Sequence, residues 1–335
     1  MQDNIHIYDK YTYDKVDDFS KIDHPIPATL KNFEYFCLNI HTDRKQTDML
    51  NLLTVTWDVN PFILTIGDFG IRWYSLFFVA GIFPIGYWIM RSFYRREGLP
   101  TETLDPLLIA LFIGTIVGAR LGHCLFYDAE YYLSHPWKIL MTREGGLASH
   151  GGAIGVLLAM WWYVHKYGRK YGFGYIQIID RLVIPVCFAG MMIRLGNLMN
   201  SEIYGTYTDL PWGFIFVRDP WGDGLPHHPT QIYEALSYCI LGLILLWLYR
   251  TRLDRLRTGT IFGIFLIVLF GMRFLIEFIK QDQSDFEAGM VLNMGQWLSL
   301  PFILTGILLL IWSARKGGPA RIQNNTVRHG ANQQH

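Results

Sequence analysis

Segment 188–205 places side chains that could bind an anion in a sequence that is otherwise apolar. Arg194 and Asn197 lie three residues apart, so they share one face of a helix, and Asn200 and Glu202 follow closely. A charge at the centre of a bilayer helix costs about 3 kcal/mol, so folding alone gives no reason for an arginine here. We therefore expect this segment to bind an anionic lipid head group inside the membrane.

Two further arginines, Arg120 and Arg273, belong to other apolar segments. At about 1.5 Å per residue, both they and Arg194 lie about 18–21 Å from the inner edge of the membrane, in the outer half of the hydrocarbon core. A guanidinium group can donate two parallel hydrogen bonds to a phosphate, so this shared depth indicates a phosphate site. The alternatives are snorkelling of Arg194 to the head groups, a structural role for Arg120, and an ion pair between Arg273 and Glu277.

His150 opens another apolar segment and is followed by Gly151 and Gly152. The free backbone N–H groups at a helix start favour an anion, and glycines let a head group approach the backbone. Histidine is also the side chain best suited to exchanging a proton near neutral pH. We expect His150 and Tyr74 at the depth of the arginines, with a capping or interfacial role for His150 as the alternative.

The composition indicates a membrane protein. Of the 335 residues, 51% are hydrophobic and only 17% are charged, whereas a soluble domain usually carries about 25% charged residues. The aromatic content of 16% suits membrane interfaces. The four cysteines are scattered without a CxxC pair, so the sequence supports neither a disulfide nor a metal site. We expect no metal, no cofactor and no nucleic-acid partner.

Seven apolar segments have roughly the length of about 20 residues that a bilayer requires. They cover residues 70–90, 107–127, 151–166, 179–200, 233–249, 259–279 and 294–313. Alternate flanks of these segments carry fourteen Lys or Arg residues against four on the opposite flanks. This bias predicts an all-α membrane protein of seven transmembrane helices, with the amino end of the first helix outside and the carboxyl end in the cytoplasm.

The remaining segments are expected to be peripheral. We interpret residues 1–48 as a poorly ordered extension and Met49 as an alternative start of the protein, because a charged tail would otherwise have to cross the membrane ahead of the first helix. We expect transmembrane helices one to four in 49–202, with an outer interfacial arm at 128–149. An outer cap follows at 203–232 with a short strand at 214–217, then helices five to seven in 233–313 and a disordered cytoplasmic tail at 314–335.

The longest motif, R-L-G-N-x-x-N-x-E-x-x-G from Arg194 to Gly205, resembles the signature of the bacterial prolipoprotein diacylglyceryl transferases. Shorter motifs agree with this resemblance in the same order along residues 57–313. They are Arg72-Trp73-Tyr74, Ser149-His150-Gly151-Gly152, His228-Pro229-Thr230-Gln231 with Tyr233-Glu234, and Arg273 with Glu277. The chain departs from the family at Ser75, where glycine is frequent, and at Leu269, where some members carry tyrosine, so no role is carried over to Leu269.

The resemblance implies a transfer reaction in the bacterial inner membrane. A diacylglyceryl group would pass from phosphatidylglycerol to the lipobox cysteine of a preprolipoprotein, giving a thioether and glycerol 1-phosphate. It implies His150 as a candidate base, with an arginine-assisted thiolate as the rival account, and Arg194 and Arg273 as the groups that hold the phosphate. The residues implied to line or brace the pocket are Tyr74, Arg120, Asn197, Asn200, Glu202, Gly205, Glu277, Gly151 and Gly152. We expect a monomer.

Two classes of protein without this activity compete with the interpretation as a transferase. A transporter could also bury arginines, but it would be expected to show a midplane site and often an inverted repeat. The charges here lie toward one face, and the sequence shows no convincing inverted repeat. A lipid-binding scaffold would need the phosphate site but no group that transfers a proton. Among enzymes, a phospholipid transferase with a different acceptor is the nearest alternative.

Overall fold

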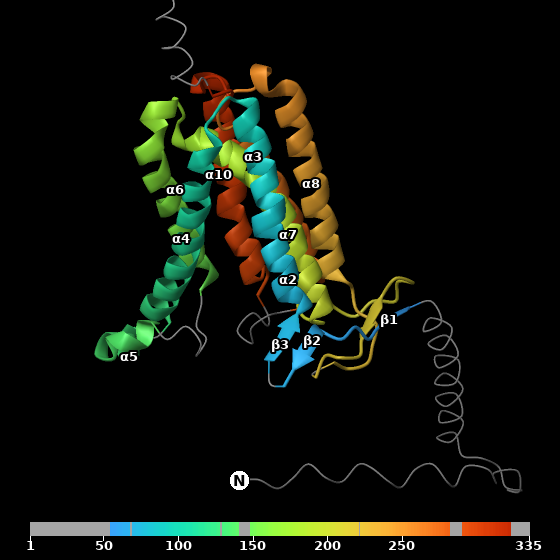
Figure 1. Ribbon diagram of the computed structural model, residues 1–335. Coiled ribbons are helices and arrows are strands. Elements are labelled where there is room, and N and C mark those ends of the chain that lie inside the picture. Colours follow the sequence, from blue (N-terminus) through green and yellow to red (C-terminus); the bar gives the residue numbers. More distant parts are fainter. Residues whose placement is uncertain are drawn as a thin grey trace, which may run out of the picture. The chain divides into compact units, whose positions relative to one another are not determined.

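The computed structural model describes residues 54–67, 69–127, 129–140, 148–220, 222–281 and 290–322 (Figure 1). The chain divides into two units, Met1–Thr54 and Val55–His335, and all elements below belong to the second. The expected extension at 1–48 lies outside the described residues.

Helices form most of the described chain. The first apolar segment is continuous through α2 (Trp73–Ala80), a π-helical turn η1 (Gly81–Gly86) that contains Pro84, and α3 (Tyr87–Arg96). The other helices are η2 (Thr101–Thr103), α4 (Leu104–Phe126), α5 (Ala129–Ser134), η3 (Pro136–Leu140), α6 (Ser149–Tyr171), α7 (Tyr175–Met199), α8 (Thr230–Arg252), η5 (Leu253–Arg255), α9 (Thr260–Ile276), η6 (Glu277–Ile279) and α10 (Met294–Lys316).

Six helical stretches among the described residues are long and apolar enough to cross a membrane. They are Trp73–Arg96, Thr101–Phe126, Tyr175–Met199, Thr230–Arg255, Thr260–Ile279 and Met294–Lys316. These helices confirm a predominantly helical membrane protein. The seventh expected segment, 151–166, is helical as part of α6 but is not among the six, so the count of seven stays a prediction.

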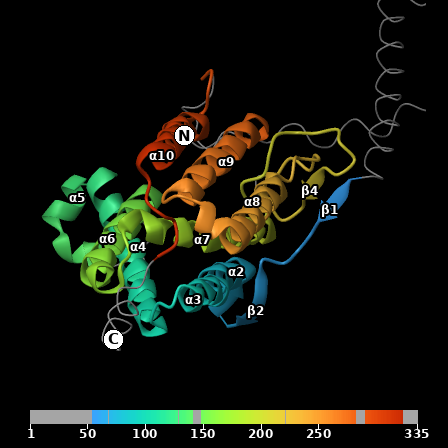
Figure 2. The same cartoon turned by 90° about the horizontal axis from the view of Figure 1, so that it is seen from above.

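Helix α7 is the element around which the others are placed. It packs against α2 and α3 on one side and against α8 and α9 on another, and α10 packs on α9. In Figure 2, α7 lies between the α4–α6 pair and α8. Helices α4 and α6 approach closely because glycines face each other: a Cβ on Gly155 would lie 1.9 Å from the carbonyl oxygen of Gly114, and one on Gly151 would lie 2.3 Å from that of Gly118.

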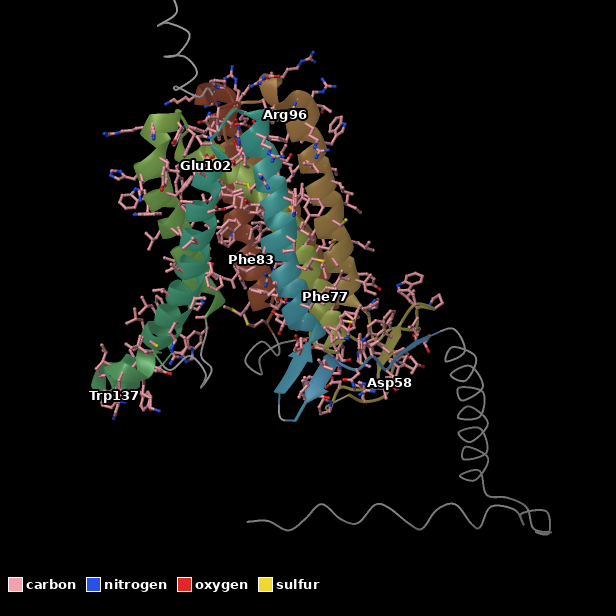
Figure 3. All side chains as sticks on the ribbon, viewed as in Figure 1. Asp58, Phe77, Phe83, Arg96, Glu102 and Trp137 are labelled. Carbon is pink, nitrogen blue, oxygen red and sulfur yellow. The ribbon has the colours of Figure 1, made fainter. Side chains whose placement is uncertain are left out.

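The end of the bundle that carries Arg96 holds a buried ion pair. In Figure 3, Arg96 and Glu102 lie at one end, and Asp58 and Trp137 lie at the other. At the Arg96 end, Arg181 pairs with Glu97 at 2.8 Å, and the Tyr249 hydroxyl donates to the same carboxylate at 2.6 Å. Because the side chains of Arg181 and Glu97 are each only 1% exposed, this pair fixes how α7 and α8 meet the end of α3.

In the part of the chain that the structure describes, four short strands form two small sheets. Strands β2 (Phe62–Ile66) and β3 (Phe69–Arg72) are antiparallel, whereas β1 (Val55–Trp57) runs parallel to β4 (Phe214–Phe216). The strand expected at 214–217 is therefore confirmed. The expected start of the first helix at residue 70 is wrong, because residues 70–72 pair with β2 and the helix begins at Trp73.

The carboxyl-terminal segment is ordered further than expected. Helix α10 runs to Lys316, and the six residues after it pack on neighbouring elements. The Ala320 carbonyl accepts a hydrogen bond from Arg181 Nη2 at 2.7 Å, the Ala320 N–H donates to the Leu256 carbonyl at 3.0 Å, and Ile322 is buried. A disordered tail beginning at residue 314 is therefore wrong for 314–322, and the rest of that tail lies outside the described residues.

Candidate functional site

The site is built on the last turn of α7 and the turn that follows it. Arg194 Nη1 donates to Asn197 Oδ1 at 3.2 Å, which realises the expected pairing on one helix face. Asn197 Nδ2 and Asn200 Nδ2 both donate to Glu202 Oε1, at 2.8 and 3.3 Å. The four polar residues of the signature therefore form one connected network, with Glu202 folded back onto the helix end.

The backbone after α7 adopts a conformation that L-residues rarely use. Ser201 and Ile203 have φ angles of 56° and 62°, in the left-handed region. The turn is held by Gln231 Nε2, which donates to the Glu202 carbonyl at 2.8 Å, and by Thr230 Oγ1, which donates to that of Ile203 at 3.1 Å. The hydrogen bonds from the start of α8 thus stabilise this strained turn and position the carboxylate of Glu202.

Glu234, on the first turns of α8, lies at the centre of the charged network. Its Oε2 is 2.8 Å from Arg194 Nε, and its Oε1 is 3.5 Å from Lys280 Nζ. The side chain of Glu234 is fully buried and that of Lys280 is 1% exposed. Burial lowers the pKa of Lys280, and the nearby carboxylate of Glu234 opposes this effect. Arg194 and Lys280 thus supply the opposite charges that compensate the burial of this carboxyl group.

Glu277 contributes a second buried carboxylate, at the end of α9. Its Oε2 lies 3.8 Å from Lys280 Nζ. A Cβ on Gly295, in the first turn of α10, would lie 2.4 Å from the carboxyl group of Glu277, so only glycine allows this approach. The start of α10 therefore adds its dipole to Lys280 in stabilising the carboxylate. Among the described residues, Glu277 forms its ion pair with Lys280, whereas the alternative considered from the sequence was a pair with Arg273.

Arg273 joins the same network from α9. It acts electrostatically on Tyr238 and on Lys280, and Arg194 acts on both groups as well. Its Nε is buried and lacks a hydrogen-bond partner among the described residues. An unsatisfied buried donor is costly, so this nitrogen is available to an oxygen of a ligand. Arg194 and Arg273 therefore both lie within electrostatic range of Tyr238 and Lys280, and their binding of a phosphate stays a prediction.

Tyr74 and Gly205 border the cluster. A Cβ on Gly196 would lie 2.9 Å from the ring of Tyr74, so glycine lets α2 pack directly on α7 at this level. Tyr74 lies within electrostatic range of Glu202 and Arg194. A Cβ on Gly205 would lie 2.4 Å from the Ile279 carbonyl oxygen, and this close approach brings the chain around Lys280 to the site.

His150 and Arg120 belong to the α4–α6 pair and its arm. His150 is exposed, and its ring lies 5.5 Å from that of Phe126 and 5.8 Å from that of Tyr127, measured between centroids. Arg120 donates to the carbonyls of Lys138 and Ile139, at 2.6 and 2.8 Å, and lies over the ring of Tyr132. These contacts give Arg120 a structural role in fixing the arm.

Gly151 and Gly152, which were expected to line the pocket, lie in the contact between α6 and α4. A Cβ on Gly151 would meet the backbone of Gly118, and one on Gly152 would lie 3.5 Å from the carbonyl oxygen of Thr115. Close helix packing therefore explains Gly151. Their part in binding a head group stays a prediction.

Sequence reasoning missed Glu234, Lys280 and Tyr238 as members of the site. Glu234 belongs to the His-Pro-Thr-Gln-x-Tyr-Glu motif, which does not by itself indicate a partner for Arg194. Lys280 follows the end of an apolar segment. Its spacing of three residues from Glu277 was the available signal.

The sequence of this chain is similar to that of known proteins. The sequence profile of the prolipoprotein diacylglyceryl transferases matches residues 61–312. A phosphatidylglycerol–prolipoprotein diacylglyceryl transferase of Tolumonas auensis is 49% identical over 260 residues, which cover 78% of this chain and 98% of the relative. Proteins of the same name from Porphyromonas gingivalis and Bacteroides fragilis are 46% and 40% identical, over 77% and 79% of this chain and 94% and 97% of their own lengths. The chain belongs to the prolipoprotein diacylglyceryl transferase family.

Proposed function

We propose that this protein transfers the diacylglyceryl group of phosphatidylglycerol to the lipobox cysteine of a preprolipoprotein. The products are a thioether-linked protein and glycerol 1-phosphate. The printed names of the relatives support the two substrates. The observation in this chain that supports the proposal is a group of three cations, the buried Lys280 and the partly buried Arg194 and Arg273, in which the buried Nε of Arg273 lacks a protein partner among the described residues.

The chemistry needs positive charge where the phosphate departs. The cysteine sulfur attacks the glycerol carbon that carries the phosphate, an S–C bond forms, and the C–O bond breaks with its electron pair left on the phosphate oxygen. A preorganised cation next to this oxygen stabilises the transition state more than the ground state. We assign this role to Arg273 and Arg194. Glu234 holds Arg194 through Nε and thereby orients its guanidinium group.

The thiol proton must be removed, because the thiolate is the nucleophile and a free thiol has a pKa of about 8.5. His150 is the proposed acceptor from the family resemblance, and stabilisation of the thiolate by the arginines is the rival. His150→Gln separates them: if His150 accepts the proton, the transfer rate falls strongly and its pH profile changes. An unchanged rate and profile in a steady-state assay would remove His150 from the reaction.

The setting of the reaction follows from the charge bias. We propose a multi-pass protein of the bacterial inner membrane, in which α6 is the seventh span and residues 203–232 form a cap on the outer side. The amino end of α2 lies outside and the carboxyl end lies in the cytoplasm. On this orientation the arginine cluster lies in the outer half of the membrane, where a secreted precursor presents its cysteine. The protein acts as a monomer.

The direct test uses purified protein, phosphatidylglycerol and a synthetic lipobox peptide. The peptide should gain the mass of one diacylglyceryl group, with an equal amount of glycerol 1-phosphate released. A peptide in which serine replaces the cysteine is the control and should remain unmodified. Binding of phosphatidylglycerol without any gain in peptide mass would favour a lipid-binding scaffold.

A further inference from the structure

A second feature that could bind a lipid lies on the α4–α6 pair. A groove of about 760 Å³ runs between these two helices, bounded along α4 by residues from Pro106 to Phe126 and along α6 by residues from Gly151 to Tyr167. Twenty residues of helix extend about 30 Å, so the groove is as long as the hydrocarbon core is thick. None of the arginines or acids of the cluster around Arg194 lines it.

The groove exists because α4 and α6 touch through glycines. Gly114, Gly118 and Gly155 lie at the crossing, where an added Cβ would collide with the backbone of the opposite helix. The floor therefore carries no side chains, whereas larger apolar residues such as Ile113 and Leu158 form the walls and are exposed. Such a surface fits flexible hydrocarbon chains.

The polar character of the groove is confined to one end. Among the described residues that line the groove, Lys166 alone is charged, and its Nζ lies 4.9 Å from the centre of the Trp162 ring and 5.4 Å from that of Tyr167. Lys166 is exposed and forms no ion pair with another described residue. Lys170, one turn further along α6, adds positive charge at the same end without lining the groove.

We infer that this groove binds an anionic phospholipid, with its acyl chains along α4 and α6 and its phosphate at Lys166. A basic site between transmembrane helices with an adjoining apolar channel suits this class of ligand. The rings of Trp162 and Tyr167 suit the interface where head group and chains meet. The groove does not include the charged residues around Arg194, and it shares only Gly151 with the residues that the family resemblance assigns to the reaction pocket. The lipid-binding proposal does not depend on the proposed reaction.

The signal helix of a precursor protein is a second amphiphile whose length would match the groove. The positive charge of Lys166 favours an anionic phospholipid over this helix. A signal sequence carries positive residues ahead of its apolar core. On the predicted orientation, those residues would lie at the end of the groove that holds Lys166 and Lys170, and like charges would repel. The groove is therefore assigned to a lipid rather than to the precursor.

The experiment uses the full-length protein in nanodiscs of phosphatidylcholine that contain a small fraction of phosphatidylserine with a photoreactive acyl chain. Phosphatidylserine is chosen because it is anionic but is not the donor in the proposed reaction. After irradiation, labelled peptides are identified by mass spectrometry. We expect labelling on α4 and α6, and a reduction of about fivefold in Lys166→Gln, since one basic residue near the surface contributes about 1 kcal/mol.

Two variants make the test specific. Lys170→Gln removes an equal charge from the same helix outside the groove and should leave the labelling nearly unchanged. Ala110→Phe narrows the groove and should reduce labelling while Lys166 is intact. Equal losses in Lys166→Gln and Lys170→Gln, or equal labelling by a photoreactive phosphatidylcholine, would overturn the proposal. Displacement of the lipid by a precursor peptide would assign the groove to the peptide instead.

Lipid transfer is measured in parallel to keep the two proposals apart. Lys166→Gln should still transfer the diacylglyceryl group at the normal rate when phosphatidylglycerol is abundant. If no variant or wild-type protein transfers it, the proposed function fails while the labelling result stands. If transfer is normal and labelling does not depend on Lys166, only the groove proposal fails.

Discussion

At the scale of residues, the site depends on buried charges that neutralise one another. Arg194 is held by Glu234 at 2.8 Å, and Lys280 lies between Glu234 and Glu277 at 3.5 and 3.8 Å. The loss of one partner leaves an uncompensated buried charge, which costs about 3–5 kcal/mol, whereas exposed pairs contribute about 0–1 kcal/mol. The same carboxylates that orient the cations thus also make the site sensitive to single substitutions.

Glu234→Gln should lower both stability and transfer. The amide keeps the shape of the side chain but leaves Arg194 and Lys280 without their shared anion, so Arg194 loses its orientation. We expect a clear fall in the thermal unfolding temperature in detergent and a loss of transfer of at least tenfold. Asp254→Asn breaks an exposed pair with Arg321 and is the matched control. Equal effects of the two substitutions would contradict the central place of Glu234.

At the scale of elements, glycines decide which helices meet. The hydropathy of the sequence was sufficient to predict the apolar helices, because each spans the membrane with its own backbone hydrogen bonds. It could not show that β2 and β3 pair just before α2, since neither strand is long or strongly patterned. A glycine in the sequence also does not show whether it permits the close approach of another helix or of a lipid head group. Gly151 and Gly152 were therefore expected at a head group, whereas the structure places them where α4 and α6 meet.

Gly155→Ala should separate α4 from α6. The added Cβ would lie 1.9 Å from the Gly114 carbonyl oxygen, and backbone on both helices would have to shift. Overpacking of this kind costs about 1–3 kcal/mol. Thermal unfolding should therefore occur at a lower temperature than in Gly152→Ala, whose Cβ would have its nearest neighbour at 3.5 Å. A Gly155→Ala variant as stable as Gly152→Ala would show that the two helices do not rely on this contact.

At the scale of the whole molecule, the segment after α10 forms hydrogen bonds that stabilise the end of the bundle that carries Arg96. Residues 317–322 contact the buried pair of Arg181 and Glu97 and the connection between α8 and α9. This segment, Gly-Gly-Pro-Ala-Arg-Ile, contains two glycines and a proline, which is typical of a loop or tail, so its order could not be predicted. Its packing comes from hydrogen bonds to distant residues, and the family profile, which ends at residue 312, does not include it.

Truncation after Lys316 should destabilise the protein without altering the arginine cluster, which lies at the other end of α7. The deletion removes the Ala320 carbonyl and leaves Arg181 with one acceptor fewer in a buried position. We expect a lower unfolding temperature but a normal transfer rate at low temperature. Truncation after Ile322 is the control and should match the full chain. Equal stability of both truncations would show that residues 317–322 add nothing to the fold.

Part of the site could be predicted from the sequence. The signature around Arg194 predicted the network with Asn197, Asn200 and Glu202, because those residues are close along the chain. The contributions of Glu234 and Lys280 depend on how α8 and the end of α9 meet α7, which no local pattern encodes. The sequence predicts only that His150 lies at the same depth in the membrane as the arginines. Its position within the plane of the membrane depends on helix packing. In the structure, His150 lies on α6, which packs against α4.

The central claim is that Arg194 and Arg273 bind the departing glycerol phosphate. The most direct measurement is the mass of a lipobox peptide after incubation with phosphatidylglycerol and Arg273→Ala or Arg194→Ala, with membrane insertion and unfolding temperature checked for each variant. If both arginines bind the phosphate, we expect both variants to insert and fold but to leave the peptide unmodified. Peptide labelling at the wild-type rate by either variant would contradict it.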